Sequence, residues 1–343
     1  MGETVIVGDT GIVRELALEA QAKLNLSLRI LGKRHDGYHD IESVVQSIDV
    51  CDGIFVRTGP PVPVGSGSRE TDIMLTCDDT SIPTGRGNLA FDAALALAEF
   101  AGLAASVEIR LEKGIPVSSG LGGGSADAAA VLLGLNHLWQ LGLGQKELMV
   151  VGERLGADVP FCIIGGTGVI RGKGERVEPL PTRDDLWFVI VTLHGRISAA
   201  QAYTVYDQLA WGCVSPDVSP DDMMSAPCAA LEMIQAIKAG TVRDVACRLT
   251  NDLERAAVSI VPSIVEAKQA LLTAGSLGVG MSGSGPTVFG IADSRKRAEQ
   301  IRSALEGARS ALGSVSNNSP INRGLFKEVL VCQAVPNGVT CKC

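Results

Sequence analysis

Residues 114–130 read Gly-Ile-Pro-Val-Ser-Ser-Gly-Leu-Gly-Gly-Gly-Ser-Ala-Asp-Ala-Ala-Ala, and this stretch decides the fold. Four glycines stand within positions 120–124. Glycine lets the backbone adopt left-handed angles and approach a ligand closely, and the free N–H groups at a helix N-terminus favour an anion. The apolar alternation over 107–111 predicts a strand before the loop, and the spacing over 126–138 predicts a helix after it. These flanks favour a loop that binds nucleotide phosphates over the alternative, a flexible linker.

The loop differs from the common P-loop, which ends in Gly-Lys-Ser/Thr with the lysine reaching the phosphates. Here Gly124 is followed by Ser125, so the cation must come from elsewhere in the chain or from a metal. The Ser125 hydroxyl can contact such a metal or cap the helix, and both interpretations stay open. For Asp127 the position favours helix capping or bracing of the loop.

Bulk composition narrows the class of protein. The chain has 343 residues, 46% hydrophobic and 20% charged, which is enough for a sizeable core in one large domain or two lobes. The net charge of −8 argues against nucleic acid as a partner, and no apolar run is long enough to cross a membrane. Nine cysteines, an odd number scattered through apolar segments, predict buried free thiols. We therefore expect a cytoplasmic protein, or a plastid stromal one if a transit peptide was removed; the sequence does not indicate an oligomeric state.

Strand-like and helix-like segments mix without a repeat, which is typical of an α+β protein of two lobes, 1–180 and 181–343. The expected strands are 22–30, 44–56, 107–111, 187–193, 287–292 and 329–334. The expected helices are 88–100, 126–138, 147–155, 231–239, 242–257, 260–274 and 294–312. The segment 60–70 is rich in Gly, Pro and Ser and predicts a surface loop.

A second glycine cluster lies at 278–286 and contains a literal G-x-G-x-x-G from Gly278 to Gly283. A dinucleotide-binding fold requires a helix directly after this pattern, whereas here more glycine, a proline and a strand follow. The context favours a tight turn that brings backbone N–H groups to an active site, with a purely structural glycine-rich hairpin as the alternative.

Three segments, in order along the chain, resemble the three motifs of the GHMP small-molecule kinases: Ala22-Lys-Leu-Asn-Leu26, Pro116 to Ala126, and Met281-Ser-Gly-Ser-Gly-Pro-Thr287. Three more resemble the branch of that family that acts on a cytidine-linked alcohol: His35-Asp-Gly-Tyr-His39, Leu155-Gly-Ala-Asp-Val-Pro-Phe161 and Asn251-Asp-Leu-Glu254. The resemblance runs from about 20 to 338, and six motifs in the right order are far more specific than any one of them.

The resemblance implies a two-lobed GHMP kinase fold with an N-terminal nucleotide-binding lobe and a C-terminal α/β sandwich lobe. The tail from about 339 lies beyond the resemblance, and its terminal position predicts that it is mobile. The resemblance also implies ATP-dependent phosphorylation of the 2-hydroxyl of 4-diphosphocytidyl-2-C-methyl-D-erythritol, in non-mevalonate isoprenoid biosynthesis, with Mg²⁺ accompanying ATP. Another kinase of the family, of the homoserine or mevalonate type, and a catalytically silent nucleotide-binding module are the alternatives. Segments 60–70 and 310–323 are longer than the family pattern needs and read as surface insertions.

The chemistry assigns roles to particular residues. On an alternating strand Lys23 and Asn25 share a face, and Lys23 can supply the missing cation. The resemblance places Asp158 beside Lys23, where its carboxylate would act on the acceptor hydroxyl as a base or as an orienting charge. By resemblance His39 reads the cytosine base, and Tyr38 and Tyr203 flank that base. This chain departs from the family pattern at Ser198-Ala-Ala200, where the family often has Ser-Thr-Ala. ATP binding is assigned to Pro116, Val117, Ser118, Ser119, Gly120, Leu121, Gly122, Gly123, Gly124, Ser125 and Ala126, and substrate binding to Asn25, Tyr38, His39, Tyr203, Gly283, Ser284 and Gly285.

Overall fold

A computed structural model describes residues 3–8, 11–64, 71–211, 229–313 and 325–342. Its first layer is a large curled sheet with the strand order β1-β2-β3-β7-β5, to which β8, β9, β11 and β15 are added. The strands of this sheet are β1 Glu3–Gly8, β2 Gly11–Lys33, β3 His39–Thr58, β5 Asp72–Cys77, β7 Ser106–Glu112, β8 Thr167–Gly172, β9 Arg176–Leu180, β11 Thr250–Asn251 and β15 Val339–Cys341. A separate pair joins β4 Val62–Pro63 to β6 Leu103–Ala104.

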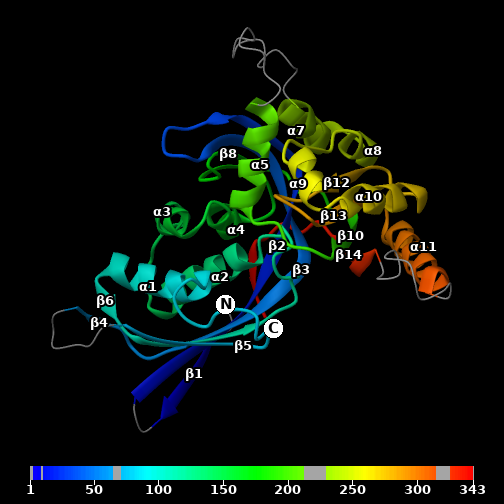
Figure 1. The fold of residues 1–343 in the computed structure, drawn as a ribbon. Helices are drawn as coiled ribbons and strands as arrows, with labels where there is room; N and C mark the ends of the chain where they lie inside the picture. Colours follow the sequence, from blue (N-terminus) through cyan, green and yellow to red (C-terminus); the bar gives the residue numbers. More distant parts are fainter. Residues whose placement is uncertain (1–2, 9–10, 65–70, 212–228, 314–324, 343) are drawn as a thin grey trace.

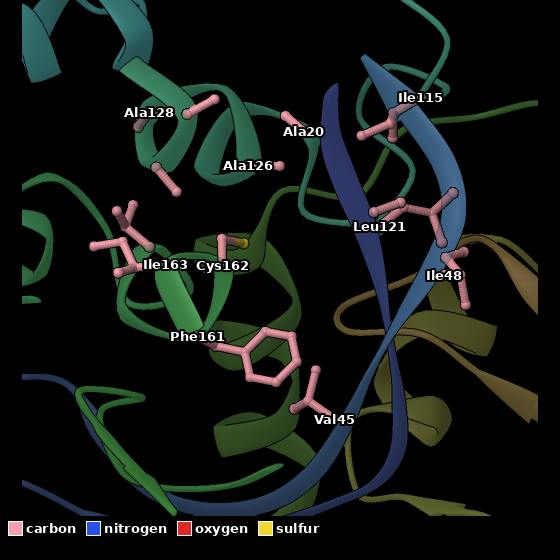
Figure 2. Packing of buried hydrophobic residues seen from close by; sticks show 14 of the residues in the cluster. Ala20, Val45, Ile48, Ile115, Leu121, Ala126, Ala128, Phe161, Cys162 and Ile163 are labelled. Carbon is pink, nitrogen blue, oxygen red and sulfur yellow. The ribbon is translucent and has the colours of Figure 1, made fainter. Parts of the chain in front are cut away.

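Four helices of the first half lie together on one side of this sheet (Figure 1). They are α1 Leu89–Ala101, α2 Gly123–Leu138, α3 Gln145–Leu155 and α4 Val159–Ile164. In Figure 2, Ala126 of α2 lies on the side of β2 and β3, and Phe161 of α4 is directed toward Val45. Because Ala126 is small and completely buried and Gly134 has no side chain, α2 packs close to the sheet and holds the glycine loop at its N-terminus against β2.

The second layer is a four-stranded sheet with the order β12-β13-β10-β14. Its strands are β10 Trp187–Leu193, β12 Val279–Met281, β13 Val288–Ala292 and β14 Phe326–Gln333. The helices of the second half are α5 Ala199–Trp211, α7 Ala229–Ala239, α8 Val242–Ala246, α9 Glu254–Ile260, α10 Ser263–Thr273 and α11 Arg295–Gly313 (Figure 1). Helices α10 and α11 pack against this second sheet, whereas α7 packs against β2 and β3 of the first sheet. The mixed helix and strand content in two layers confirms the predicted α+β fold.

Two predicted elements are wrong. The expected single helix over 242–257 divides into α8, β11 and α9. Asn251 interrupts it because its amide group donates to the carbonyl oxygens of Met281 and Gly283, at 2.9 Å each, while its own oxygen accepts from Leu253 N–H. Side-chain bonds of this kind offer the backbone an alternative to helical hydrogen bonding. The expected strand over 22–30 is also too short, since buried alternating residues continue to Leu16 and the strand itself to Gly11.

The C-terminal residues from 339 do not form a mobile tail. β15 pairs antiparallel with β2, Val339 opposite Ala20, and Lys342 N–H donates to Ala17 O at 3.0 Å. The backbone N–H and C=O groups of β2 are free to pair with one more strand at this edge, and residues 339–341 supply that strand. Residues late in the chain thus complete the first sheet, and a division between 180 and 181 stays a prediction. Of the expected surface insertions 60–70 and 310–323, the parts 65–70 and 314–323 lie outside the described residues.

In the part of the chain that the structure describes, no single helix is long and apolar enough to cross a membrane. The bent pair α9 and α10 passes such a test by length and composition, with a bend of 115°. Six described cysteines are free, and among them Cys162 and Cys332 are buried as expected, whereas Cys247 is exposed.

Candidate active site

The glycine loop has the backbone shape that its sequence predicts. Gly120 and Gly122 have φ values of 79° and 78°, in the region that favours glycine. A Cβ atom on Gly122 would lie 3.0 Å from Lys23 Cγ, and one on Gly120 would lie 2.5 Å from the carbonyl oxygen of Ser282. Glycine is therefore required here both by the backbone conformation and by the close approach of two other segments.

Helix α2 begins at Gly123, three residues earlier than the pattern predicts, with Gly122 as its N-cap. Gly122 has no side chain to bond the first N–H groups, so these groups remain available at the helix N-terminus. Ser125 lies within the first turn rather than at the cap, so the capping interpretation of Ser125 is wrong. The N-terminus of α2 thus has the features of an anion site.

Two adjoining cavities of about 700 and 410 Å³ open over this loop. Both are lined by Lys113, by residues 115–119 and by Arg196, and the smaller one continues over the glycines to Ser125 and Asn88. In the larger cavity, the wall opposite the loop is formed by the second half of the chain. Residues 192–196 and Lys327 contribute to this wall. The predicted loop residues from Pro116 to Ser125 therefore line a cleft between the two layers, of the size that a nucleotide needs, whereas Ala126 is completely buried and lines neither cavity.

Lys23 and Asp158 form an ion pair beside the glycine loop. Lys23 is 4% exposed, and its Nζ lies 2.7 Å from Asn25 Oδ1 and 3.2 Å from Asp158 Oδ2. Lys23 N–H also donates to Leu121 O at 2.9 Å, which ties β2 to the glycine loop. Asp158 makes no capping bond to α4, and its side chain is 33% exposed. A lysine and an accessible carboxylate thus stand next to the glycine loop.

The second glycine cluster forms the hairpin between β12 and β13 and lies directly against this pair. Ser282 Oγ donates to Gly120 O at 3.1 Å and accepts from Asn25 N–H at 3.4 Å. A Cβ atom on Gly283 would lie 3.5 Å from Lys23 Nζ. A strand and not a helix follows the cluster, which excludes the dinucleotide pattern. The cluster is a glycine-rich hairpin, and a role of its N–H groups in the active site stays a prediction. The hydrogen bonds of Ser282 to Asn25 and Gly120 were not predicted, because no local pattern in the sequence connects these residues.

The predicted cytosine-reading residues are brought together only in part. His39 is 8% exposed, and its ring stacks on Tyr203 with centroids 4.7 Å apart and planes at 18°. Tyr38 is 60% exposed, and its ring lies 5.4 Å from Lys173 Nζ. Burial, and secondarily the charge of Asp158, raises the pKa of Tyr203, so this ring lies within the electrostatic reach of the Lys23–Asp158 pair.

A buried ion cluster below the loop was not predicted. Lys113 Nζ bonds Asp52 and lies 2.6 Å from Asp127 Oδ2, and all three side chains are at most 8% exposed. Asp52 Oδ1 also accepts the N–H groups of Gly114 and Ile115 at 2.8 Å. Burial raises the pKa of Asp127 to about 8, although Lys113 acts in the opposite direction. Asp127 therefore braces the loop rather than capping the helix.

Comparison with known proteins agrees with this geometry. Residues 88–166 match the model of the GHMP kinases N terminal domain, and residues 233–310 match that of the GHMP kinases C terminal domain. A 4-diphosphocytidyl-2-C-methyl-D-erythritol kinase of Gloeobacter violaceus is 40% identical over 86% of this chain and 91% of its own length. The chain belongs to this family of GHMP kinases. A relative of the same name from Pelotomaculum thermopropionicum is 42% identical over 82% of this chain and 91% of its own length.

Solved structures show the same GHMP kinase fold. A crystal structure of 4-(cytidine 5'-diphospho)-2C-methyl-D-erythritol kinase matches with a TM-score of 0.63 and 31% identity, over 86% of this chain and 96% of that chain. Homoserine kinase from Cytophaga hutchinsonii matches with a TM-score of 0.69 over 95% and 96% of the two chains, at 21% identity. The latter likeness shows the fold alone. As a GHMP kinase, the chain is an ATP-dependent small-molecule kinase.

Proposed function

We propose that this chain transfers the γ-phosphoryl group of ATP to the 2-hydroxyl of 4-diphosphocytidyl-2-C-methyl-D-erythritol, in non-mevalonate isoprenoid precursor biosynthesis. The observation that carries the proposal is the Lys23–Asp158 pair beside the glycine loop, and the stacked rings of His39 and Tyr203 support it in a chain of this kinase family. A homoserine or mevalonate kinase would have no need for aromatic and imidazole groups that suit a pyrimidine.

In the proposed reaction some residues bind the phosphates and others stabilise the charge of the transferred group. Phosphoryl transfer depends mainly on positioning and on stabilisation of charge at the transferred group. In our proposal the N–H groups of 120–125 hold the phosphates, and the Lys23 ammonium stabilises the negative charge that is transferred. Asp158 accepts a hydrogen bond from the acceptor hydroxyl and takes its proton, or orients it, as the alcohol oxygen attacks phosphorus and ADP leaves. We also assign Gly283, Ser284 and Gly285 to binding of the acceptor alcohol, because a Cβ atom on Gly283 would lie 3.5 Å from Lys23 Nζ.

Mg²⁺ is proposed to arrive with ATP. The described residues contain no group of three His, Cys, Asp or Glu side chains that could hold a metal. Mg²⁺ can keep several waters and be bound mainly by substrate phosphates, so it needs few ligands from the protein. Ser125, in the first turn of α2 and on the wall of the smaller cavity, is the residue we propose as a ligand. The ion would neutralise part of the phosphate charge when bound.

Location and recognition complete the proposal. The free state of the six described cysteines supports a reducing compartment, and we propose the cytoplasm. On the acceptor side, His39 would bond the cytosine edge, with Tyr38 and Tyr203 contributing aromatic contact.

The proposal is tested by ADP release in the presence of Mg²⁺ and ATP, with each of three alcohols added separately. We expect release above the no-alcohol background with 4-diphosphocytidyl-2-C-methyl-D-erythritol and none with homoserine or mevalonate. The Asp158→Asn variant serves as the control for contaminating kinases. Release with homoserine or mevalonate at a higher kcat/KM would overturn the proposal.

A further inference from the structure

The imidazole of His39 is held by residues that no sequence motif connects. Its Nε2 lies 2.7 Å from Asp207 Oδ1, and the other carboxylate oxygen of Asp207 lies 2.6 Å from Lys33 Nζ. Lys33 is the direct cross-strand neighbour of His39 in the β2–β3 pairing. Tyr203 and Asp207 lie one helical turn apart on α5, so one side chain stacks on the imidazole and the other bonds its edge.

These contacts determine which ring nitrogen carries the proton. An ionised carboxylate is an acceptor only, so Nε2 of His39 must be the donor. Burial works to raise the pKa of Asp207, but hydrogen bonds from Lys33 and His39 outweigh it and hold that pKa below its usual value, so the carboxylate is ionised at neutral pH. In the neutral imidazole only one ring nitrogen carries a proton, so the second nitrogen is then without one.

The remaining nitrogen, Nδ1, is then an acceptor. It makes no hydrogen bond within the described ranges of the chain, and it is not among the fully buried atoms that lack a partner. An accessible lone pair fixed in this way accepts from an amino group and repels a carbonyl oxygen. Cytosine presents an amino group at C4, where uracil presents a carbonyl.

We propose that Asp207, shared with Lys33, is a positioning residue that keeps Nδ1 of His39 an acceptor, and that this acceptor selects a 4-amino pyrimidine over a 4-oxo pyrimidine. The inference rests on the proposed function, since it concerns the base of that substrate. Asp207 itself does not touch the substrate and acts through His39.

Asp207→Asn gives a directional test. Lys33 donates hydrogen bonds only, so it holds the amide oxygen of the new side chain and turns the amide NH₂ toward His39. Nε2 must then accept, and the ring proton moves to Nδ1. We expect the cytidine-to-uridine ratio of kcat/KM to fall by at least about 10-fold, because the buried ring edge now suits a carbonyl. Asp207→Glu keeps a carboxylate and should retain most of the ratio, and Asp40→Asn, next to His39 but bonded to Arg34, should leave it unchanged.

Nitrogen-15 NMR of the imidazoles reads the tautomer without activity, with His39 assigned among the four histidines by its loss in His39→Ala. We expect the proton on Nε2 in the wild type and on Nδ1 in Asp207→Asn. A wild-type proton on Nδ1, or an unchanged selectivity ratio in a folded Asp207→Asn enzyme, would overturn the inference. If the wild type instead phosphorylates neither pyrimidine substrate, the proposed function fails, while the tautomer is still read.

Discussion

Lys23 is nearly buried, yet its ammonium group has an amide oxygen and a carboxylate oxygen within hydrogen-bonding distance. Burying an ammonium group is costly unless such partners replace water. Asn25, which holds one side of Lys23, is itself fixed by a hydrogen bond to Ser43 Oγ at 2.9 Å. The position of the charge is therefore set by the sheet before any ligand arrives, which is what electrostatic stabilisation of a transferred phosphoryl group requires.

Asp158→Asn removes the negative charge but keeps the size of the side chain. We expect turnover to fall by about 100-fold or more, the usual scale for a positioned acid–base group, with ATP affinity nearly unchanged because the glycine loop is intact. Single-turnover kinetics and ATP titration measure the two quantities separately. A single-turnover rate near that of the wild type would rule out a role for this carboxylate in the chemistry.

His39→Ala should raise the KM of the cytidine substrate with little effect on that of ATP. The lost hydrogen bond and the unpaired base edge correspond to about 1–3 kcal/mol, or roughly 5- to 150-fold in kcat/KM. Because the contact is remote from the reacting hydroxyl, kcat should fall less than kcat/KM. Steady-state kinetics with each substrate varied in turn provides the check, and His137→Ala, a change away from both cavities, is the control. Retention of full cytidine selectivity would show that His39 does not read the base.

At the scale of elements, the glycine loop joins three segments, since β2, α2 and the β12–β13 hairpin all meet around Gly120 and Gly122. The sequence allowed prediction of the loop, of α2 and of the shared face of Lys23 and Asn25, because each follows from residues close together in the chain. The contacts of Asp207, Ser282 and Asp52 could not be predicted, because they join residues 61 to 257 positions apart. Such pairs depend on how the layers fold together and leave no local pattern.

Gly122→Val should weaken ATP binding far more than binding of the cytidine substrate. The valine residue would have to keep a backbone φ of +78°, which a β-branched residue rarely adopts. Its Cβ atom would also lie only 3.0 Å from Lys23 Cγ. Calorimetric titration with a non-hydrolysable ATP analogue measures the effect. Gly142→Val is a matched control, because Gly142 has a similar φ of 69°, open space around it and a place outside both cavities. Equal analogue affinity in a folded Gly122→Val protein would show that the loop does not hold the phosphates.

The buried cluster of Asp52, Lys113 and Asp127 should make stability depend on pH. The folded pKa of Asp127, about 8, lies above the ordinary value of 3.8, so the folded state binds a proton that the unfolded state releases. Its contribution is complete below about pH 4 and is lost as the pH rises through about 8. Urea unfolding at pH 5.5 and 8.5 should show a smaller decline of the unfolding free energy with pH in Asp127→Asn than in the wild type. An equal decline in both proteins would contradict the raised pKa.

For the whole molecule, the site exists because the two halves of the chain interlock. β11 and β15, from late in the sequence, pair with β2, and Asn251 at the end of β11 holds the β12–β13 hairpin against Lys23. The cleft over the loop has one wall from each layer. Separating the lobes between 180 and 181 would therefore take the β12–β13 hairpin and Tyr203 away from the site and would remove two of the strands that pair with β2.

The position of the transferred phosphate tests the account most directly. The enzyme is incubated with ATP, Mg²⁺ and 4-diphosphocytidyl-2-C-methyl-D-erythritol, and the product is examined by phosphorus-31 NMR without proton decoupling. We predict a new phosphomonoester signal that is a singlet, because C2 carries a methyl group and no hydrogen, formed one for one with ADP and absent with Asp158→Asn. A phosphomonoester signal split by a neighbouring proton, or ADP formed without any new ester, would contradict transfer to the 2-hydroxyl.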